Sequence, residues 1–338
     1  MIVDIDELKV ILEKVSPGLG TDRLVEGLNR FTFSEGNVIT YNDKISISAR
    51  CEVEEEFSVD ATDFLSMCKN FSGSVNLFIK ENKIILNSRK VKGGCSISTV
   101  SDEVKEAIEQ LALVKEEKKK LPSNFLEGVA LCLFSIGKST GRNLDCIFIQ
   151  DNKMYSSDNL RISEFSLSSS INNTLLLPGN VVENLLHLSP IQFQYSSSWI
   201  HFWDNESTKF SIRLAIGDYP EILPEFFELD DSCEIRFPKG MAEEIKQMIP
   251  LSKGEYDIDK EILLSSIGKG RLSCKAEREG VWVEKIIATD SEEETDVSFT
   301  INPLFLSDVL TRTDCFQVNQ EKALFSFEDF RHVLTLIA

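Results

Sequence analysis

The segment Gly137–Thr140 reads GKST and carries the residue types of two catalytic motifs. GKST ends a phosphate-binding loop, but that motif requires a glycine five residues before Gly137, where the chain has Cys132. GKSTG also has the spacing of the G-x-S-x-G nucleophile elbow, which would make Ser139 a nucleophile. Both motifs need a helix after them, whereas the DCIFIQ that follows alternates as a strand does. We therefore expect a surface turn; a hydrolase that uses Ser139 is the alternative, and Ser139→Ala would abolish its activity.

Other residues that could perform chemistry are scattered. The eight cysteines stand singly, and none lies near His187, His201 or His332 in the sequence. Neither a disulfide framework nor a structural zinc site is expected from this spacing. The run DSEEETD at Asp290–Asp296 is interpreted as a solvated acidic loop. No pair of carboxylates is spaced for acid–base work. We expect no metal, no cofactor and no catalytic residue.

Length and charge narrow the class of protein. A chain of 338 residues suits two or three domains. No apolar run approaches the ~20 residues of a membrane span, and the start MIVDIDELKV lacks the basic region of a signal peptide. We expect a cytoplasmic protein without membrane contact. The net charge of −19 argues against a protein that binds nucleic acid by covering phosphates with cations.

One design occurs three times along the chain. Three segments each begin as a short strand and continue as an amphipathic helix: FSVDATDFLSMC, TLLLPGNVVENLL and FTINPLFLSDVL. Asp60, Pro178 and Asn302 stand at the helix starts, where a capping side chain or a first-turn proline belongs. Their separations of 118 and 124 residues are those of whole domains rather than of solenoid repeats.

The flanking segments repeat as well. A helix precedes each copy, over Ile5–Val15, Asn124–Ile136 and Pro238–Ile249. A hairpin of two alternating strands follows each copy, SVNLFIK with KIILNS, IQFQY with WIHFWD, and CFQVN with ALFSFED. Linkers are expected near Val114–Pro122 and Pro224–Ser232. The pattern predicts an α+β protein of three similar domains, at residues 1–121, 122–229 and 230–338.

Within this frame, individual motifs resemble those of a known family. MYSSDNLRISEF resembles the A-T-D-G-x-R-L turn in the middle domain of bacterial sliding clamps, the β subunit of the replicative DNA polymerase. Asp158, Arg161 and Ile162 match this motif, and Ser157 stands for threonine. The two positions that depart from it are Asn159 and Leu160.

Three further segments extend the resemblance to the end of the chain. RLAIGDYPEILP at Arg213–Pro224 is similar to R-L-I-x-G-x-[YF]-P-[DE], which closes the middle domain of the family. TINPLFLSDVL resembles F-N-x-x-Y-L-x-D-x-L of the third domain, with Phe305 in place of tyrosine. HVLTLIA aligns with the terminal Y-V-x-M-P-M-R, but Thr335–Ala338 replaces Met-Pro-Met-Arg. From this altered tail and the short chain we expect a divergent member that a phage or a mobile element encodes.

The resemblance implies a function without catalysis. Sliding clamps are head-to-tail homodimeric rings that encircle double-stranded DNA and tether the polymerase, and a clamp loader places them there. Retention by encirclement also tolerates a net negative charge, since it does not depend on phosphate affinity. The alternative in the same fold is a scaffold that recruits repair or transcription proteins to DNA.

Two sites follow from the resemblance. The inner wall of the ring would carry the DNA-facing cations Arg23, Lys69, Lys138, Arg142, Lys246, Lys253 and Arg312. A pocket for partner peptides would comprise Ser157, Asn159, Leu160, Arg161, Ile162, Pro224, Phe305, Val333, Leu334, Thr335 and Leu336.

Overall fold

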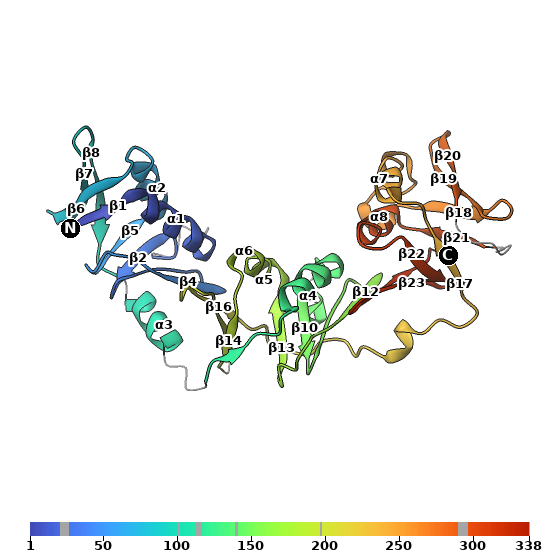
Figure 1. Ribbon diagram of the computed structural model, residues 1–338, viewed down its shortest axis with the longest axis horizontal. Helices are drawn as coiled ribbons and strands as arrows, with labels where there is room; N and C mark the ends of the chain where they lie inside the picture. The colour runs from blue at the N-terminus through green and yellow to red at the C-terminus, as the bar shows by residue number, and fades with distance from the viewer. Residues whose placement is uncertain are drawn as a thin grey trace. The chain divides into compact units, whose positions relative to one another are not determined.

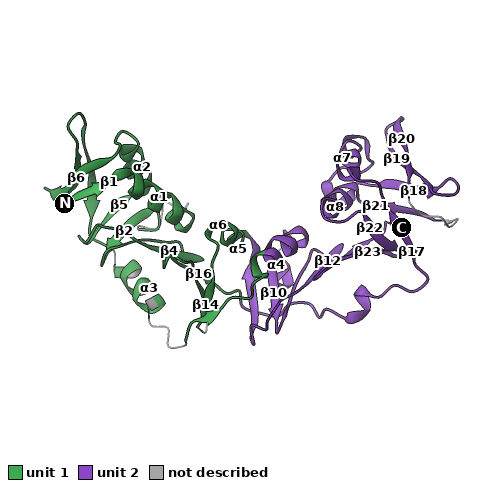
Figure 2. Ribbon diagram, viewed as in Figure 1, with its two compact units in different colours: residues 1–126, 180–215 green, residues 127–179, 216–338 purple. Residues whose placement is uncertain are grey.

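The computed structural model describes residues 1–20, 27–100, 102–112, 117–138, 141–196, 198–289 and 297–337. Figure 1 shows their helices and strands in chain order. These residues form two compact units, one of residues 1–126 with 180–215 and one of residues 127–179 with 216–338 (Figure 2). Antiparallel sheets and short helices make up each unit, as the predicted α+β class requires. No described helix is long and apolar enough to cross a membrane.

The first unit is built on an antiparallel sheet. Its twelve described strands follow the order β1-β6-β7-β8-β5-β2-β3-β4-β16-β15-β14-β9. Their bounds are β1 Ile2–Asp4, β2 Arg30–Ser34, β3 Asn37–Tyr41, β4 Ile45–Arg50, β5 Phe57–Asp60, β6 Ser74–Lys80, β7 Lys83–Asn87, β8 Lys92–Ser98, β9 Lys119–Lys120, β14 Gln192–Tyr195, β15 Trp199–Trp203 and β16 Lys209–Arg213. The predicted hairpins are confirmed as β6–β7 and β14–β15.

Capping side chains fix the helix starts of this unit. α1 (Ile5–Val15) begins after Asp4, whose carboxylate accepts the N–H groups of Asp6 and Glu7. The predicted amphipathic helix is confirmed, since its buried residues are Ile5, Leu8, Leu12 and Val15 and the helix packs on β3 and β4 of the sheet. α2 (Ala61–Cys68) begins after Asp60, which caps the N–H of Asp63 as predicted. The other helices are α3 (Asp102–Ala112), α6 (Leu185–Leu188) and the 3-10 turn η1 (Ser16–Gly18).

The second unit contains two antiparallel sheets. The eight described strands of one sheet follow the order β13-β10-β11-β12-β24-β23-β22-β17, and the four of the other follow β20-β19-β18-β21. Their bounds are β10 Cys146–Gln150, β11 Lys153–Ser157, β12 Arg161–Ser166, β13 Thr174–Pro178, β17 Cys233–Arg236, β18 Ile262–Ser266, β19 Arg271–Arg278, β20 Val281–Ala288, β21 Ser298–Ile301, β22 Cys315–Val318, β23 Lys322–Phe327 and β24 Phe330–Thr335. The third predicted hairpin is confirmed as β22–β23.

Helices α7 (Met241–Lys246) and α8 (Pro303–Val309) lie side by side over the C-terminal core (Figure 1). That core buries the aromatic rings of Phe299, Phe316 and Phe325 together with Leu306 of α8. The remaining helical elements are α4 (Phe125–Cys132), α5 (Gly179–Val182), η2 (Leu133–Ser135), η3 (Gly141–Asn143), η4 (Pro224–Phe227), η5 (Ile249–Leu251) and η6 (Asp257–Asp259).

Two junctions join strands that are far apart in the sequence, and they have the same design. In the first unit β4 pairs with β16, with Ser48 opposite Lys209. In the second unit β12 pairs with β24, with Glu164 opposite Arg331. In both cases the last strand of a three-stranded meander, β2–β4 or β10–β12, pairs with the last strand of a later group of three. We call this later group, β14–β16 or β22–β24, a hairpin unit. The chain therefore repeats one way of extending a sheet.

The structure differs from the predicted elements in two places. The linker expected before Pro122 is preceded by the helix α3, and Lys119–Lys120 near its end is the strand β9. The single helix predicted after Pro178 is divided into α5 and α6, with Glu183 and Asn184 between them. The partition into three domains stays a prediction.

Candidate peptide-binding pocket

The turn between β11 and β12 has a conformation set by its own side chains. The Asp158 carboxylate accepts the N–H groups of Leu160 and Arg161, each at 3.1 Å, and the Ser157 hydroxyl accepts the N–H of Asn159 at 3.2 Å. Asn159 has a φ of 74°, in the left-handed region that asparagine tolerates and where the family motif has glycine. The departure at this position is therefore compatible with the same turn.

Arg161 connects this turn to α8. Its Nε donates to Asp158 at 2.9 Å, and its Nη1 lies 3.6 Å from the carboxylate of Asp308. The guanidinium also stacks 4.0 Å from the centre of the Phe305 ring. Arg161 is mostly buried, so these contacts hold the turn against the C-terminal core.

Strand β24 supplies a second wall because it pairs with β12. Ile162 lies opposite Val333, and the Thr335 N–H and hydroxyl both donate to the carbonyl of Leu160, at 2.9 and 2.8 Å. Side chains alternate along β24, so Val333 and Thr335 face one side of the sheet and Leu334 faces the other.

The third wall is the segment that leads from β16 to β17. Its start is fixed by Asn143, whose amide donates to the carbonyl of Asp218 at 3.0 Å, and by Tyr219, which stacks 5.0 Å from Phe148. Burial raises the pKa of the Tyr219 phenol, so this side chain stays neutral. Farther along, Lys322 donates to the carbonyls of Glu225 and Phe226 at 2.8 and 3.0 Å.

These three walls enclose a cavity of about 280 Å³. Apolar side chains dominate its lining, with Leu160, Ile162, Ile222, Phe226 and Val333 among them. Since a cavity of about 150 Å³ can hold a benzene ring, this volume suits about two side chains of leucine or phenylalanine size. A short peptide with two apolar anchors fits this site better than a polar metabolite does.

The structure brings seven of the eleven predicted pocket residues to the lining: Ser157, Asn159, Leu160, Arg161, Ile162, Val333 and Thr335. The other four face elsewhere. Leu334 and Leu336 pack with the C-terminal core, and Phe305 packs against the same core beneath Arg161. Pro224 is exposed at the start of η4. Lining residues that the sequence did not indicate are Leu144, Pro220, Glu221, Ile222, Phe226 and Lys322.

An ion cluster stabilises the strand junction beside the pocket. Arg331 donates to Glu164 through Nε at 2.9 Å and Nη2 at 2.5 Å, and Lys153 donates to the same carboxylate at 2.8 Å. Burial alone would raise the pKa of Glu164, but the bonds from Lys153 and Arg331 hold this pKa below its ordinary value. Glu164 therefore stays ionised and links β11, β12 and β24.

Two serine–histidine pairs occur in the sheets, but solvent does not reach them. The Ser163 hydroxyl lies 2.8 Å from Nδ1 of His332, and the Ser211 hydroxyl lies 2.8 Å from Nδ1 of His201. All four side chains are buried, so neither pair can meet a substrate. Ser139 lies outside the described residues, as does Asp290–Asp296. Among the described residues no group of histidine, cysteine, aspartate or glutamate is placed to hold a metal ion.

The predicted DNA-facing cations have different surroundings. Arg23 lies outside the described residues. Lys246 and Lys253 are exposed but form ion pairs with Glu243 at 3.0 Å and Glu261 at 2.8 Å. The remaining four are exposed near the ends of helical elements, Lys69, Lys138, Arg142 and Arg312.

Arg312 lies 5.9 Å from the ring of Phe134 in η2, and this contact brings the end of α8 close to the loop that carries Lys138. Ion pairing reduces the positive field of Lys246 and Lys253. Whether these cations meet DNA stays a prediction.

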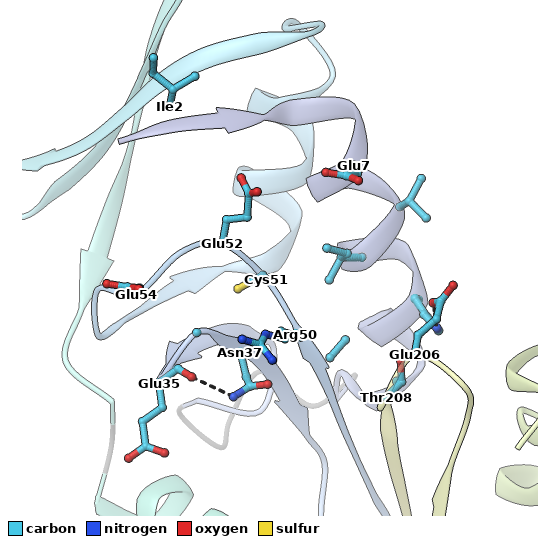
Figure 3. A pocket seen from close by; sticks show the side chains of 15 residues that line it. Ile2, Glu7, Glu35, Asn37, Arg50, Cys51, Glu52, Glu54, Glu206 and Thr208 are labelled. Carbon is cyan, nitrogen blue, oxygen red and sulfur yellow. Dashed lines mark hydrogen bonds and ion pairs between the residues drawn. The ribbon is translucent and has the colours of Figure 1, made fainter. Parts of the chain in front are cut away.

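A wider groove in the first unit has the opposite charge. It has a volume of about 1320 Å³ and is lined by α1 and by the ends of β3 and β4. Figure 3 shows the carboxylates of Glu7, Glu35, Glu52, Glu54 and Glu206 around it. Lys14, one of two cations in the lining, is held by Asp204 at 2.6 Å and Glu206 at 2.7 Å. This groove is unsuited to phosphates.

No protein-family model matches the sequence, and no curated protein matches it. Solved structures match it over its full length. The Bacillus subtilis DNA polymerase sliding clamp superposes with a TM-score of 0.83 at 15% identity, covering 100% of this chain and 98% of that one. A putative DNA polymerase III β subunit from Eubacterium rectale gives 0.81 at 17% identity, covering 99% and 98%.

The DNA polymerase III subunit β from Pseudomonas aeruginosa gives 0.80 at 15% identity, covering 100% and 99% of the two chains. All three superpose on this chain over nearly its whole length. The phage origin predicted above stays a prediction. The chain has the fold of the bacterial DNA polymerase sliding clamps.

Proposed function

We propose that this chain is a DNA sliding clamp, a ring-forming processivity factor that encircles duplex DNA and tethers a replicative polymerase. The main support for this proposal is the full-length structural similarity to clamp structures, with TM-scores of 0.80 to 0.83. A fold alone does not determine function. The proposal is therefore supported by two further features, the free strand edges and the apolar pocket.

The free edges support closure of the ring by a second copy. Among the described residues, β20 pairs on one side only, and Lys92–Ser96 of β8 has no strand partner on the side away from β7. β20 is the last strand of its meander, as β4 and β12 are, and β8 is the last strand of its hairpin unit, as β16 and β24 are. A third junction of the repeated design would therefore join β20 of one copy to β8 of another.

The charges at these edges are complementary. Glu284 on β20 corresponds to Glu164 on β12. Glu284 lies opposite Lys275 of the middle strand β19, and Glu164 lies opposite Tyr155 of the middle strand β11. Glu164 meets Arg331 across its junction. The β7–β8 turn and the start of β8 carry the exposed cations Arg89, Lys90 and Lys92. A head-to-tail homodimer would place these cations near Glu284 of the next copy, as the two junctions within the chain suggest.

The apolar pocket would serve as the docking site for short peptides of the polymerase and the clamp loader. DNA would be retained by encirclement, with only weak contacts from the exposed cations. Such a protein acts by topology and needs no catalytic group.

The decisive experiment is retention on DNA of different topology. The chain is loaded by a clamp loader onto nicked circular DNA, and its oligomeric mass is measured by light scattering. A dimer should stay on circles and dissociate when a restriction enzyme linearises them. A monomer in solution and equal retention on both forms would refute the proposal.

A further inference from the structure

A small polar cavity in the first unit lies apart from the pocket and the acidic groove. It has a volume of about 200 Å³ and lies between strands β2, β5 and β8 and the start of α3. Five of its eight lining residues have hydrogen-bonding side chains, Arg30, Thr32, Ser58, Ser98 and Thr99. The other three are Gly27, Val100 and Val104, so no carboxylate is part of this described lining.

Strand register explains why these hydroxyls meet. Thr32 of β2 lies opposite Ser58 of β5, and Ser58 lies opposite Ser98 of β8. Directly opposed residues point to the same face of a sheet, so the three hydroxyls form a row across three strands. Arg30 is two residues before Thr32 and lies on the same face, where its Nη1 donates to the Ser98 hydroxyl at 2.8 Å.

Two of these hydroxyls are buried and have unused hydrogen-bonding capacity. Thr32 is 3% exposed and Ser58 is 2% exposed. Within the described part of the chain, neither hydroxyl forms a hydrogen bond, and neither oxygen is among the fully buried side-chain atoms that lack a partner, so both oxygens are reached from the cavity. Arg30 has five N–H donors, and one of them is used at Ser98. The cavity therefore presents a cation and several donors to whatever occupies it.

The surroundings favour an anion. The carboxylate that register places nearest is Asp60, opposite Arg30. Asp60 is already committed, since Oδ1 caps the N–H of Asp63 and Oδ2 accepts the Asn29 amide at 3.0 Å. In a chain with a net charge of −19, a cavity with one arginine, four hydroxyls and no carboxylate in its described lining is an exception.

We propose that this cavity binds a phosphate-type tetrahedral oxyanion. A guanidinium with hydroxyl donors is the usual set for such an ion. A water molecule takes about 30 Å³, so a cavity of this size holds a five-atom oxyanion and a few waters but no nucleoside. The bound ion would contact Arg30, Ser58 and Ser98 while Val100 and Val104 cover it. Because Val104 belongs to α3, binding of the oxyanion would favour the docking of α3 on the sheet.

The test is calorimetric titration of the full chain with sodium phosphate at constant ionic strength. Arg30→Gln should weaken binding at least about tenfold, and Ser58→Ala about threefold, because each removes donors to the ion. Arg50→Gln is the matched control, since Arg50 is an exposed arginine of the same unit that lines the acidic groove. Its affinity should equal that of the unchanged chain.

Two further arms make the result specific. Adenosine monophosphate should bind far more weakly than phosphate, because the cavity excludes the nucleoside; equal affinity would place the ion on an open surface and overturn the proposal. Hydrogen exchange of the α3 amides should slow in phosphate. If Arg30→Gln does not fold, the isosteric Thr32→Val takes its place. Absence of saturable binding, or equal affinity of both arginine variants, refutes the site whether or not the chain is a clamp.

Discussion

At the scale of single residues, the two buried histidines make folding sensitive to acid. Burial lowers the pKa of His201 to about 3, and the nearby charge of Lys209 adds to this effect. Burial likewise lowers the pKa of His332 to about 3, with the charge of Arg161 contributing. Both imidazoles are therefore neutral in the folded chain, and each is held by a serine hydroxyl.

We predict that the free energy of unfolding decreases as the pH falls from about 6.5 toward 3. The unfolded chain protonates each imidazole near pH 6.5, whereas the folded chain does so only near pH 3. The unfolded state thus binds more protons in this window, and each histidine lowers stability by up to about 1.4 kcal/mol per pH unit. Above pH 6.5 the contribution is fully present.

Urea unfolding at about pH 7 and about pH 5.5 measures the effect. Replacing His332 by Gln should reduce the change in the free energy of unfolding between the two pH values by the contribution of one histidine. The matched control is His187→Gln, since His187 is exposed and should leave this change unaltered. A change that is the same in all three chains would show that neither histidine is buried neutral.

At the scale of elements, two residues that cap helix N-termini differ in the number of hydrogen bonds that they make. Asp4 caps α1 from an exposed position and makes two bonds to backbone N–H groups. Asn302 is buried, caps α8 through the N–H groups of Leu304 and Phe305, and also donates to the carbonyls of Asp257 and Ile258. Asn302 therefore fixes a helix start and a loop together.

We predict that Asn302→Ala destabilises the fold by about 2–3 kcal/mol and Asp4→Ala by about 1 kcal/mol. The first removes a cap and leaves two carbonyls without their donor, while the second removes a cap alone. Chemical denaturation with tryptophan fluorescence measures both values. Equal costs would show that the bonds to Asp257 and Ile258 add nothing.

Elements with a strong local signal could be predicted from the sequence. Asp60 and Asn302 stand where a cap is required, and both cap a helix. α3 has apolar residues at Val104, Ile108 and Leu111, but no helix is predicted there from the sequence, and only the charged segment after it, Val114–Pro122, is interpreted as a linker. Because the segment after β16 has no regular periodicity, its spacing could not indicate that Pro220 rather than Pro224 lines the pocket. Contacts of irregular segments depend on tertiary packing.

At the scale of the whole molecule, the free edge of β20 is the feature on which the proposed assembly would depend. Trp282 is 59% exposed there, and Val281 and Ile286 are exposed beside it. Burial of one aromatic ring of this kind removes about 150–250 Å² from water. The proposed junction with β8 of a second copy would cover this strand.

We predict that Trp282→Glu with Ile286→Glu weakens the proposed dimer by at least about a hundredfold, because charges would replace two apolar contacts at the proposed interface. Sedimentation equilibrium measures the dissociation constant. Ile216→Glu is the control, because Ile216 is highly exposed but lies in the segment after β16. If the double variant and the control dimerise equally well, the interface lies elsewhere.

The same edge would be a hazard for any state in which the proposed ring is open. An unpaired strand with exposed valine, tryptophan and isoleucine side chains is a template on which other chains can add strands and aggregate. Glu284 lies in the middle of this strand and would act as a gatekeeper, since a like charge opposes pairing of β20 with another β20. Assembly in the wrong order is thus penalised by the residue that would guide the correct one.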